Sequence, residues 1–185
     1  TAAVGVDAGI INPDENLGYV GLSWQKDASW GDYHVTTLTD YGETVNLVNA
    51  MTYSDNIYFA REALKIGADT MEEKLKSFGV EEELPFDLTM QASTFDDDGK
   101  IDSEIQLADS GYGQGEVLVN PLHLAALYTG FANNGNVISP YLLYKGNPEP
   151  KIWLEQAYTP EAAQLIERID AGYQLPPRDR LRRKT

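Results

Sequence analysis

Three short polar residues, Ser54, Asp55 and Asn56, separate two apolar runs that have helical spacing, over 45–52 and 56–66. Side chains of Ser, Asp and Asn form hydrogen bonds with nearby backbone groups, so they end one helix and begin the next. Apolar residues of the second run recur at intervals of three and four, and a glycine follows the run as a typical stop. The stretch therefore predicts two helices joined by a tight polar corner.

The remainder of the chain predicts further short helices and few strands. Residues 1–11 have the pattern of the end of a helix, and 17–41 that of short strands and loops anchored on the core by Trp24 and Trp30. The other expected elements are a helix from Asp69 or Thr70 to Gly79 with a capping box at Thr70 and Glu73, an acidic loop over 80–104, a helix from Pro121 with Asn120 as its N-cap, an edge strand over 136–143 and a last helix from Pro160.

Composition narrows the class of protein. Of the 185 residues, 42% are apolar and 10% aromatic, which is typical of a folded domain. The formal net charge of −15 disfavours nucleic acid as a partner, because phosphate backbones bind basic surfaces. The chain has no cysteine, so it has neither disulfides nor a cysteine-based metal site.

The two ends of the chain differ from its middle. Residues 171–185 contain five basic residues and one acidic residue and show no core periodicity, so we interpret them as a basic Pro/Arg-rich tail. The chain begins in the middle of an apolar pattern and without Met, from which we expect a piece of a longer protein. No apolar run reaches the roughly 18 residues of a membrane span.

Two loops are considered as candidate sites for a metal or a cofactor, and both lack residues that such a site requires. The acidic run 96–99 lacks the glycine and glutamate spacing of a calcium loop, so we interpret it as an exposed loop. Gly111, Gly113 and Gly115 allow close backbone approach, but no basic residue accompanies them as a phosphate site would require. His123 has no partner at metal-ligand spacing and is interpreted as a residue on a helix surface or behind a site. The sequence predicts no cofactor and no metal.

Three segments together are far more specific than the polar corner alone. They are Trp24-Gln25-Lys26-Asp27 with Ser29-Trp30-Gly31, then Ser54 to Arg61, then Ala108 to Glu116 with Asn120-Pro121. In this order they resemble the class B penicillin-binding proteins of Gram-positive bacteria, and most of all their low-affinity branch associated with β-lactam resistance. The resemblance runs from Thr1 to Asp170.

This resemblance implies a fold. It predicts an α+β, mostly helical structure, the helical subdomain portion of the penicillin-binding and serine β-lactamase-like transpeptidase fold, with few strands. Residues 1–170 would be a partial transpeptidase domain, and 171–185 would lie outside the family pattern.

The resemblance also implies roles for individual residues. The family acylates a serine in an S-x-x-K motif and uses S-x-N and K-[ST]-G as its second and third motifs. Ser54 matches the serine whose hydroxyl relays a proton, and Asn56 matches the amide that positions the substrate. Asp55, Tyr112, Gly113 and Gln114 are the expected substrate-binding residues.

The nucleophile is not among the residues that match. Ser23 and Lys26 spell S-x-x-K, but the motif must open a buried apolar helix and their surroundings are polar and loop-like. We therefore reject this pair and expect the nucleophilic serine upstream of Thr1. Lys184-Thr185 falls roughly where the third motif belongs, but it lacks the glycine and a strand pattern. The chain alone is expected to be inactive.

The predicted function is thus a fragment of a serine-type D,D-transpeptidase that cross-links peptidoglycan stem peptides and binds β-lactams. The alternatives are a non-catalytic binding or scaffold module, or a β-lactam sensor domain of the same fold. The expected partners are stem peptides and β-lactams, and not nucleic acid. The parent protein would be membrane-anchored on the extracytoplasmic face, within a cell-wall synthesis complex.

Overall fold

Helices carry most of the regular structure in the computed structural model, which describes residues 1–143, 146 and 149–172. In chain order the elements are α1 (Ala2–Asp7), β1 (Ser23–Trp24), η1 (Ala28–Trp30), β2 (Val35–Thr36), α2 (Leu47–Tyr53), α3 (Asn56–Ile66), α4 (Ala68–Ser77), α5 (Glu104–Ser110), α6 (Pro121–Thr129), η2 (Phe131–Asn133), β3 (Val137–Ile138), β4 (Ile152–Leu154) and α7 (Pro160–Gly172). The prediction of an α+β, mostly helical fold is confirmed.

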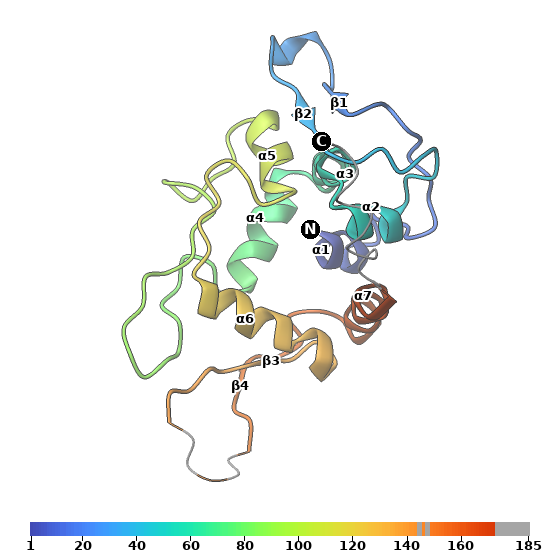
Figure 1. Cartoon of the computed structure of the whole chain (residues 1–185). Coiled ribbons are helices and arrows are strands. Elements are labelled where there is room, and N and C mark those ends of the chain that lie inside the picture. Colours follow the sequence, from blue (N-terminus) through green and yellow to red (C-terminus); the bar gives the residue numbers. More distant parts are fainter. Residues whose placement is uncertain (144–145, 147–148, 173–185) are drawn as a thin grey trace, which may run out of the picture.

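Helix α3 is the centre of the arrangement, because it contacts α1, α2, α4, α5 and β2 (Figure 1). Its apolar positions recur at helical spacing and are buried, with Ile57, Ala60 and Ala63 each at most 3% exposed. Gly67 ends the helix at φ 84°, a conformation that costs glycine little. The predicted helix over 56–66 is confirmed.

Two antiparallel pairs of short strands lie at opposite ends of the molecule (Figure 1). Strands β1 and β2 form a hairpin that carries the tryptophans, and Trp30 is buried beneath it. Strand β3 pairs with β4 and covers only the start of the edge strand expected over 136–143, because Pro140 has no N–H to continue the ladder. Strand β4 was not predicted.

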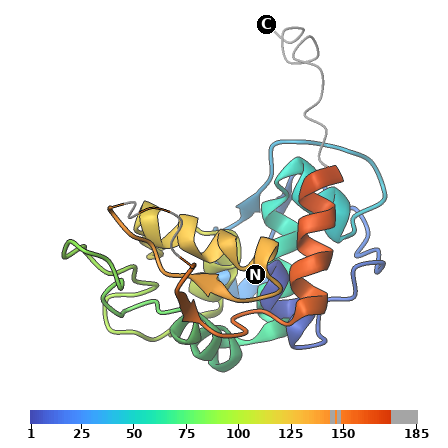
Figure 2. The same ribbon diagram turned by 90° about the horizontal axis from the view of Figure 1, so that it is seen from below.

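The last helix, α7, packs against α1, α2 and η2, as Figure 2 shows from below. It begins at Pro160 as expected and continues to Gly172, past the expected domain boundary at residue 170. The rest of the basic tail, with Lys184-Thr185, lies outside the described residues. Among the described residues, no helix is long and apolar enough to cross a membrane.

Two local predictions are corrected. Helix α4 begins at Ala68 and makes no side-chain capping bond, so the capping box expected at Thr70 and Glu73 is not formed. The segment before the glycine-rich loop forms a helix, α5, capped by the Ser103 side chain, which accepts a bond from the Gln106 amide at 3.1 Å. The first error concerns a helix end, where neighbouring structure decides the boundary, and the second is a short helix that was not predicted.

Burial excludes one of the two positions expected for His123, the helix surface, because only 1% of the residue is exposed. Its Nε2–H donates to the Phe78 carbonyl at 2.8 Å, and this bond leaves Nδ1 to accept from the Ser93 hydroxyl at 2.8 Å. The Ser93 oxygen accepts in turn from the Asn120 amide at 3.0 Å. The histidine thereby joins the end of α4 to the start of α6.

The buried imidazole predicts a pH dependence of stability. Burial lowers the pKa of His123 below its ordinary 6.5. The folded chain then binds fewer protons than the unfolded chain, so this contribution to stability is complete above about pH 6.5 and is lost as the pH falls through the folded pKa. We expect urea midpoints to drop as the pH falls below about 6.5.

The control for this prediction is His123→Gln, which should lose that part of the slope. Burial also lowers the pKa of the Thr1 α-amino group, to about 6, which adds slope of the same sign between pH 6 and 8 in both chains. Only the difference between the two pH profiles reports on His123. Parallel profiles would show that His123 does not titrate in the folded range.

Candidate functional site

The polar corner between α2 and α3 is built around a buried carboxylate. Asp55 is 4% exposed and caps α3, where its Oδ1 accepts from the amides of Ile57 at 2.9 Å and Tyr58 at 3.2 Å. Its Oδ2 accepts a bond from the Tyr41 hydroxyl. The predicted helix cap is confirmed. The three bonds give this carboxylate a structural role, and contact of Asp55 with substrate stays a prediction.

Ser54 ends α2 in a strained conformation. Its backbone is left-handed, with φ 55° and ψ 53°, which is uncommon for a residue other than glycine. The residue is exposed and borders a hollow of about 230 Å³ together with Met51, Thr52, Ile169 and Asp170. Backbone strain of this kind is often found at functional sites, where surrounding structure holds it in place.

Asn56 is the first residue of α3 and faces a different hollow. Its Nδ2 donates to the Thr36 carbonyl of β2 at 2.9 Å, which fixes the amide plane. The hollow has a volume of about 260 Å³ and is lined by Tyr33, His34, Thr36, Asn56, Asp109, Tyr112, Gln114 and Gly115. One N–H of the Asn56 amide and its oxygen are not used in bonds to described residues, so both are available to a ligand.

Asp109 joins two sides of this hollow. The Tyr33 hydroxyl from the β1–β2 hairpin and the Tyr112 hydroxyl from the glycine-rich loop both donate to its Oδ1. Burial, and then the hydrogen bond to Asp109, raises the pKa of both phenols above the usual range, so both stay protonated donors at neutral pH. The sequence analysis did not single out Asp109.

The glycine-rich loop follows directly from α5. Gly111 is packed so tightly that an added Cβ would lie 2.6 Å from the Phe59 carbonyl oxygen, so only glycine fits there. Gly113 has φ 76° and open space around it, and the Gln114 amide donates to the Asp109 carbonyl at 3.0 Å. The loop is thus turned back over the carboxylate, with the Gln114 side chain exposed.

Comparison with known proteins decides the family. The family model described as penicillin binding protein transpeptidase domain matches residues 1–169. The chain belongs to the penicillin-binding protein transpeptidase family. A relative, penicillin-binding protein 3 of Bacillus subtilis (strain 168), is 45% identical over 165 residues, which are 89% of this chain and 25% of the relative. The chain therefore spans about a quarter of the length of this relative.

Solved structures share the fold of this chain at low sequence identity. The crystal structure of a peptidoglycan glycosyltransferase from Burkholderia ambifaria matches with a TM-score of 0.75 at 20% identity, over 91% of this chain and 51% of that one. The imipenem acyl-enzyme complex of penicillin-binding protein A from Mycobacterium tuberculosis matches with a TM-score of 0.77 at 20% identity, over 93% and 41%.

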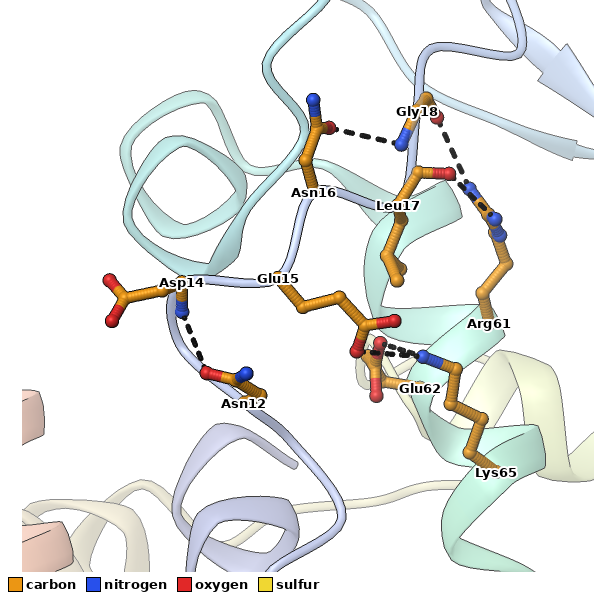
Figure 3. Close-up of polar contacts among 9 residues, drawn as sticks. All are labelled: Asn12, Asp14, Glu15, Asn16, Leu17, Gly18, Arg61, Glu62 and Lys65. Carbon is orange, nitrogen blue, oxygen red and sulfur yellow. Dashed lines mark hydrogen bonds and ion pairs between the residues drawn. The ribbon is translucent and has the colours of Figure 1, made fainter.

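Two basic residues of α3, Arg61 and Lys65, make polar contacts that Figure 3 shows. Arg61 donates to the carbonyls of Leu17 at 2.9 Å and Gly18 at 3.3 Å, which ties the loop after α1 to the helix. Lys65 pairs with Glu62 at 2.9 Å. Glu62 is 1% exposed, and its second oxygen has no partner among the described residues.

Ser23 and Lys26, the rejected S-x-x-K pair, lie in a strand and in the loop that follows it. Ser23 lies in β1 and not at the start of a helix. Lys26 forms an ion pair with Glu104 of α5 and thereby holds the pKa of that carboxyl below its usual range. Trp30 packs edge-to-face on Trp24 with ring centres 5.5 Å apart. Ser23 and Lys26 therefore belong to a packed hairpin.

The structure brings together part of the predicted site of this penicillin-binding protein domain. Asn56, Tyr112 and Gln114 line one hollow although they come from different elements. Ser54 borders another hollow, and Asp55, which lies between Ser54 and Asn56 in the chain, is buried. The residues that sequence reasoning missed are Tyr33, His34, Thr36 and Asp109. The only usable signal for Asp109 was its place at the end of the run that leads into the three glycines.

Proposed function

We propose that this chain is part of a D,D-transpeptidase that cross-links peptidoglycan stem peptides and is acylated by β-lactams. Membership of the family supports this, as does 45% identity to a relative named penicillin-binding protein 3. The observation that carries the proposal is the Asn56 amide, held by Thr36 and turned to a polar hollow shared with Tyr112 and Gln114. An extended peptide needs such donors and acceptors to align its backbone.

The roles follow from the chemistry of acyl transfer. The Ser54 hydroxyl would relay a proton to or from the leaving amine, and the Asn56 amide would orient the substrate backbone. The buried Asp55 keeps both residues in place by capping α3. An acyl transfer also needs an activated nucleophile, which we place upstream of Thr1, so that the 185-residue chain alone is inactive.

Several finer assignments belong to the same proposal. Residues 1–170 would form the partial transpeptidase domain, within the low-affinity, resistance-associated branch of Gram-positive bacteria. The parent protein would be anchored in the membrane on its extracytoplasmic face and take part in a cell-wall synthesis complex. These assignments rest on the sequence resemblance.

The proposal predicts the effect of two substitutions in the full-length protein that contains this chain. Ser54→Ala and Asn56→Ala should each slow acylation by a fluorescent penicillin by about 10²–10³-fold, because each removes one proton-transfer or positioning group. Stopped-flow fluorescence gives the rate. The control is Ser77→Ala, which should leave the rate unchanged because it removes an exposed hydroxyl whose one hydrogen bond to described residues is to the Lys74 carbonyl.

Two outcomes would contradict this proposal. Unchanged acylation in both variants would remove Ser54 and Asn56 from the mechanism. A full-length protein that takes no label at all would favour a non-catalytic scaffold instead, and one that is labelled but does not cross-link stem peptides would favour a β-lactam sensor. Labelling of the 185-residue chain by itself would show that the nucleophile lies within it.

A further inference from the structure

We propose that Asp109 makes the hollow beside Asn56 a binding site for a primary ammonium group, the acceptor amine of the cross-linking reaction. This inference rests on the proposed transpeptidase function and assigns one of its two substrates to a place in the fold. It concerns binding of the acceptor and not the acyl-transfer step.

Only one of the two carboxylate oxygens of Asp109 accepts hydrogen bonds from the described residues. Its Oδ1 accepts from the hydroxyls of Tyr33 and Tyr112. Its Oδ2 accepts no hydrogen bond from the described residues and lies toward Gly115, where an added Cβ would be 3.9 Å away. Because an ionised carboxylate can accept about four hydrogen bonds, Oδ2 keeps its capacity for a ligand.

The two tyrosines make the position of this carboxylate rigid. They approach from separate parts of the chain, one from the β1–β2 hairpin and one from the glycine-rich loop, and meet on the same oxygen. Their rings leave the Asp109 side chain half-buried at the edge of the hollow. A fixed, partly desolvated carboxylate binds a cation more strongly than a mobile surface carboxylate does.

The charge of the hollow selects the kind of ligand. Among the described residues that line it, Asp109 is the only carboxylate and there is no lysine or arginine. The cation carried by the nearby hairpin, Lys26, is already paired with Glu104. An anionic group would be repelled from this lining, whereas an ammonium group, with three donors and no acceptor, matches the free oxygen and the Asn56 oxygen.

The reaction supplies such a group. Cross-linking forms an amide bond between a donor acyl group and an amine, so the acceptor peptide must bring an amino group, which is protonated in neutral water. A carboxylate beside the substrate-positioning Asn56 would hold this amine near the reacting bond. Asp109 is then a substrate-binding residue for the acceptor, while Tyr33 and Tyr112 are positioning residues.

The test uses the 185-residue chain and two small probes. Nα-acetyl-L-lysine methylamide carries the primary ammonium group, and Nα-acetyl-L-norleucine methylamide is its neutral counterpart. Titrations are followed by NMR at the amides of Gly113 and Gly115 and at the Asn56 side chain. We expect saturable shifts with the lysine probe only, and about tenfold weaker binding in Asp109→Asn, which removes the charge but keeps an oxygen for the tyrosines.

The matched control is Asp102→Asn, which removes the same charge from an exposed residue outside the hollow and should change the affinity less than twofold. Equal weakening in both variants would mean that the probe senses only the general field of a chain with net charge −15, and the proposal would fail. Equal shifts with the norleucine probe in the unaltered chain would also overturn it, even if Asp109→Asn did not fold.

Failure here can be told apart from failure of the proposed function. Penicillin acylation of the full-length protein tests the donor side and does not need an acceptor amine. If acylation slows as expected in the Ser54 and Asn56 variants but the chain does not bind the lysine probe, only the role of Asp109 is overturned. Lysine binding at Asp109 without any acylation would leave an ammonium site in a protein that is not a transpeptidase.

Discussion

Replacing Gly135 by alanine is expected to lower the free energy of unfolding by about 4 kcal/mol. The residue has φ 89°, which an L side chain rarely adopts, and an added Cβ would lie 1.9 Å from the carbonyl oxygen of Tyr158. That atom belongs to the backbone, so no side-chain rotation can relieve the clash. Urea unfolding monitored by circular dichroism measures the loss.

Gly42→Ala is the control for this substitution. Gly42 has a similar φ of 96°, but no atom lies within 4 Å of the position of its added Cβ. Its replacement should cost only the backbone strain, about 1 kcal/mol. The difference in unfolding free energy between the two variants isolates the clash at Tyr158. The Tyr158 ring packs between the rings of Phe131 and Phe78, with centre-to-centre distances of 4.5 Å and 5.1 Å. Equal losses would show that the turn can shift without disturbing this core.

Asp55→Ala is expected to cost about 3 kcal/mol of unfolding free energy. The substitution removes the cap of α3 and leaves the amides of Ile57 and Tyr58 and the hydroxyl of Tyr41 without their acceptor, in a buried place. Asp55→Asn keeps an oxygen for the two amides and should cost about half as much. Both values come from urea unfolding.

Hydrogen exchange provides a second reading of this prediction. The amides of Ile57 and Tyr58 should lose protection in Asp55→Ala and retain most of it in Asp55→Asn, because only the asparagine can still cap the helix. Protection that is unchanged in the alanine variant would show that tertiary packing of α3 alone fixes the corner. In that case the bonds of Asp55 would not hold Ser54 and Asn56 in position.

The sequence was sufficient for features that depend on neighbours along the chain. The polar corner, the helix over 56–66 with its glycine stop, and the Asn120 cap followed by Pro121 were all predicted correctly. Caps, stops and helical periodicity are local interactions, so their residue types are visible in a stretch of a few positions. The family resemblance was also predicted from three segments of the sequence, and the family model matches residues 1–169.

Only the tertiary structure decided which of these residues meet. Asn56 lies far along the chain from Asp109 and Tyr112, and it meets them because α3 packs against α5 and β2. The burial of His123 and the pairing of β3 with β4 likewise depend on contacts across the molecule. The Ser54-Asp55-Asn56 corner shows both levels: its cap could be predicted locally, whereas the orientation of Ser54 and Asn56 toward different hollows depends on what packs around α2 and α3.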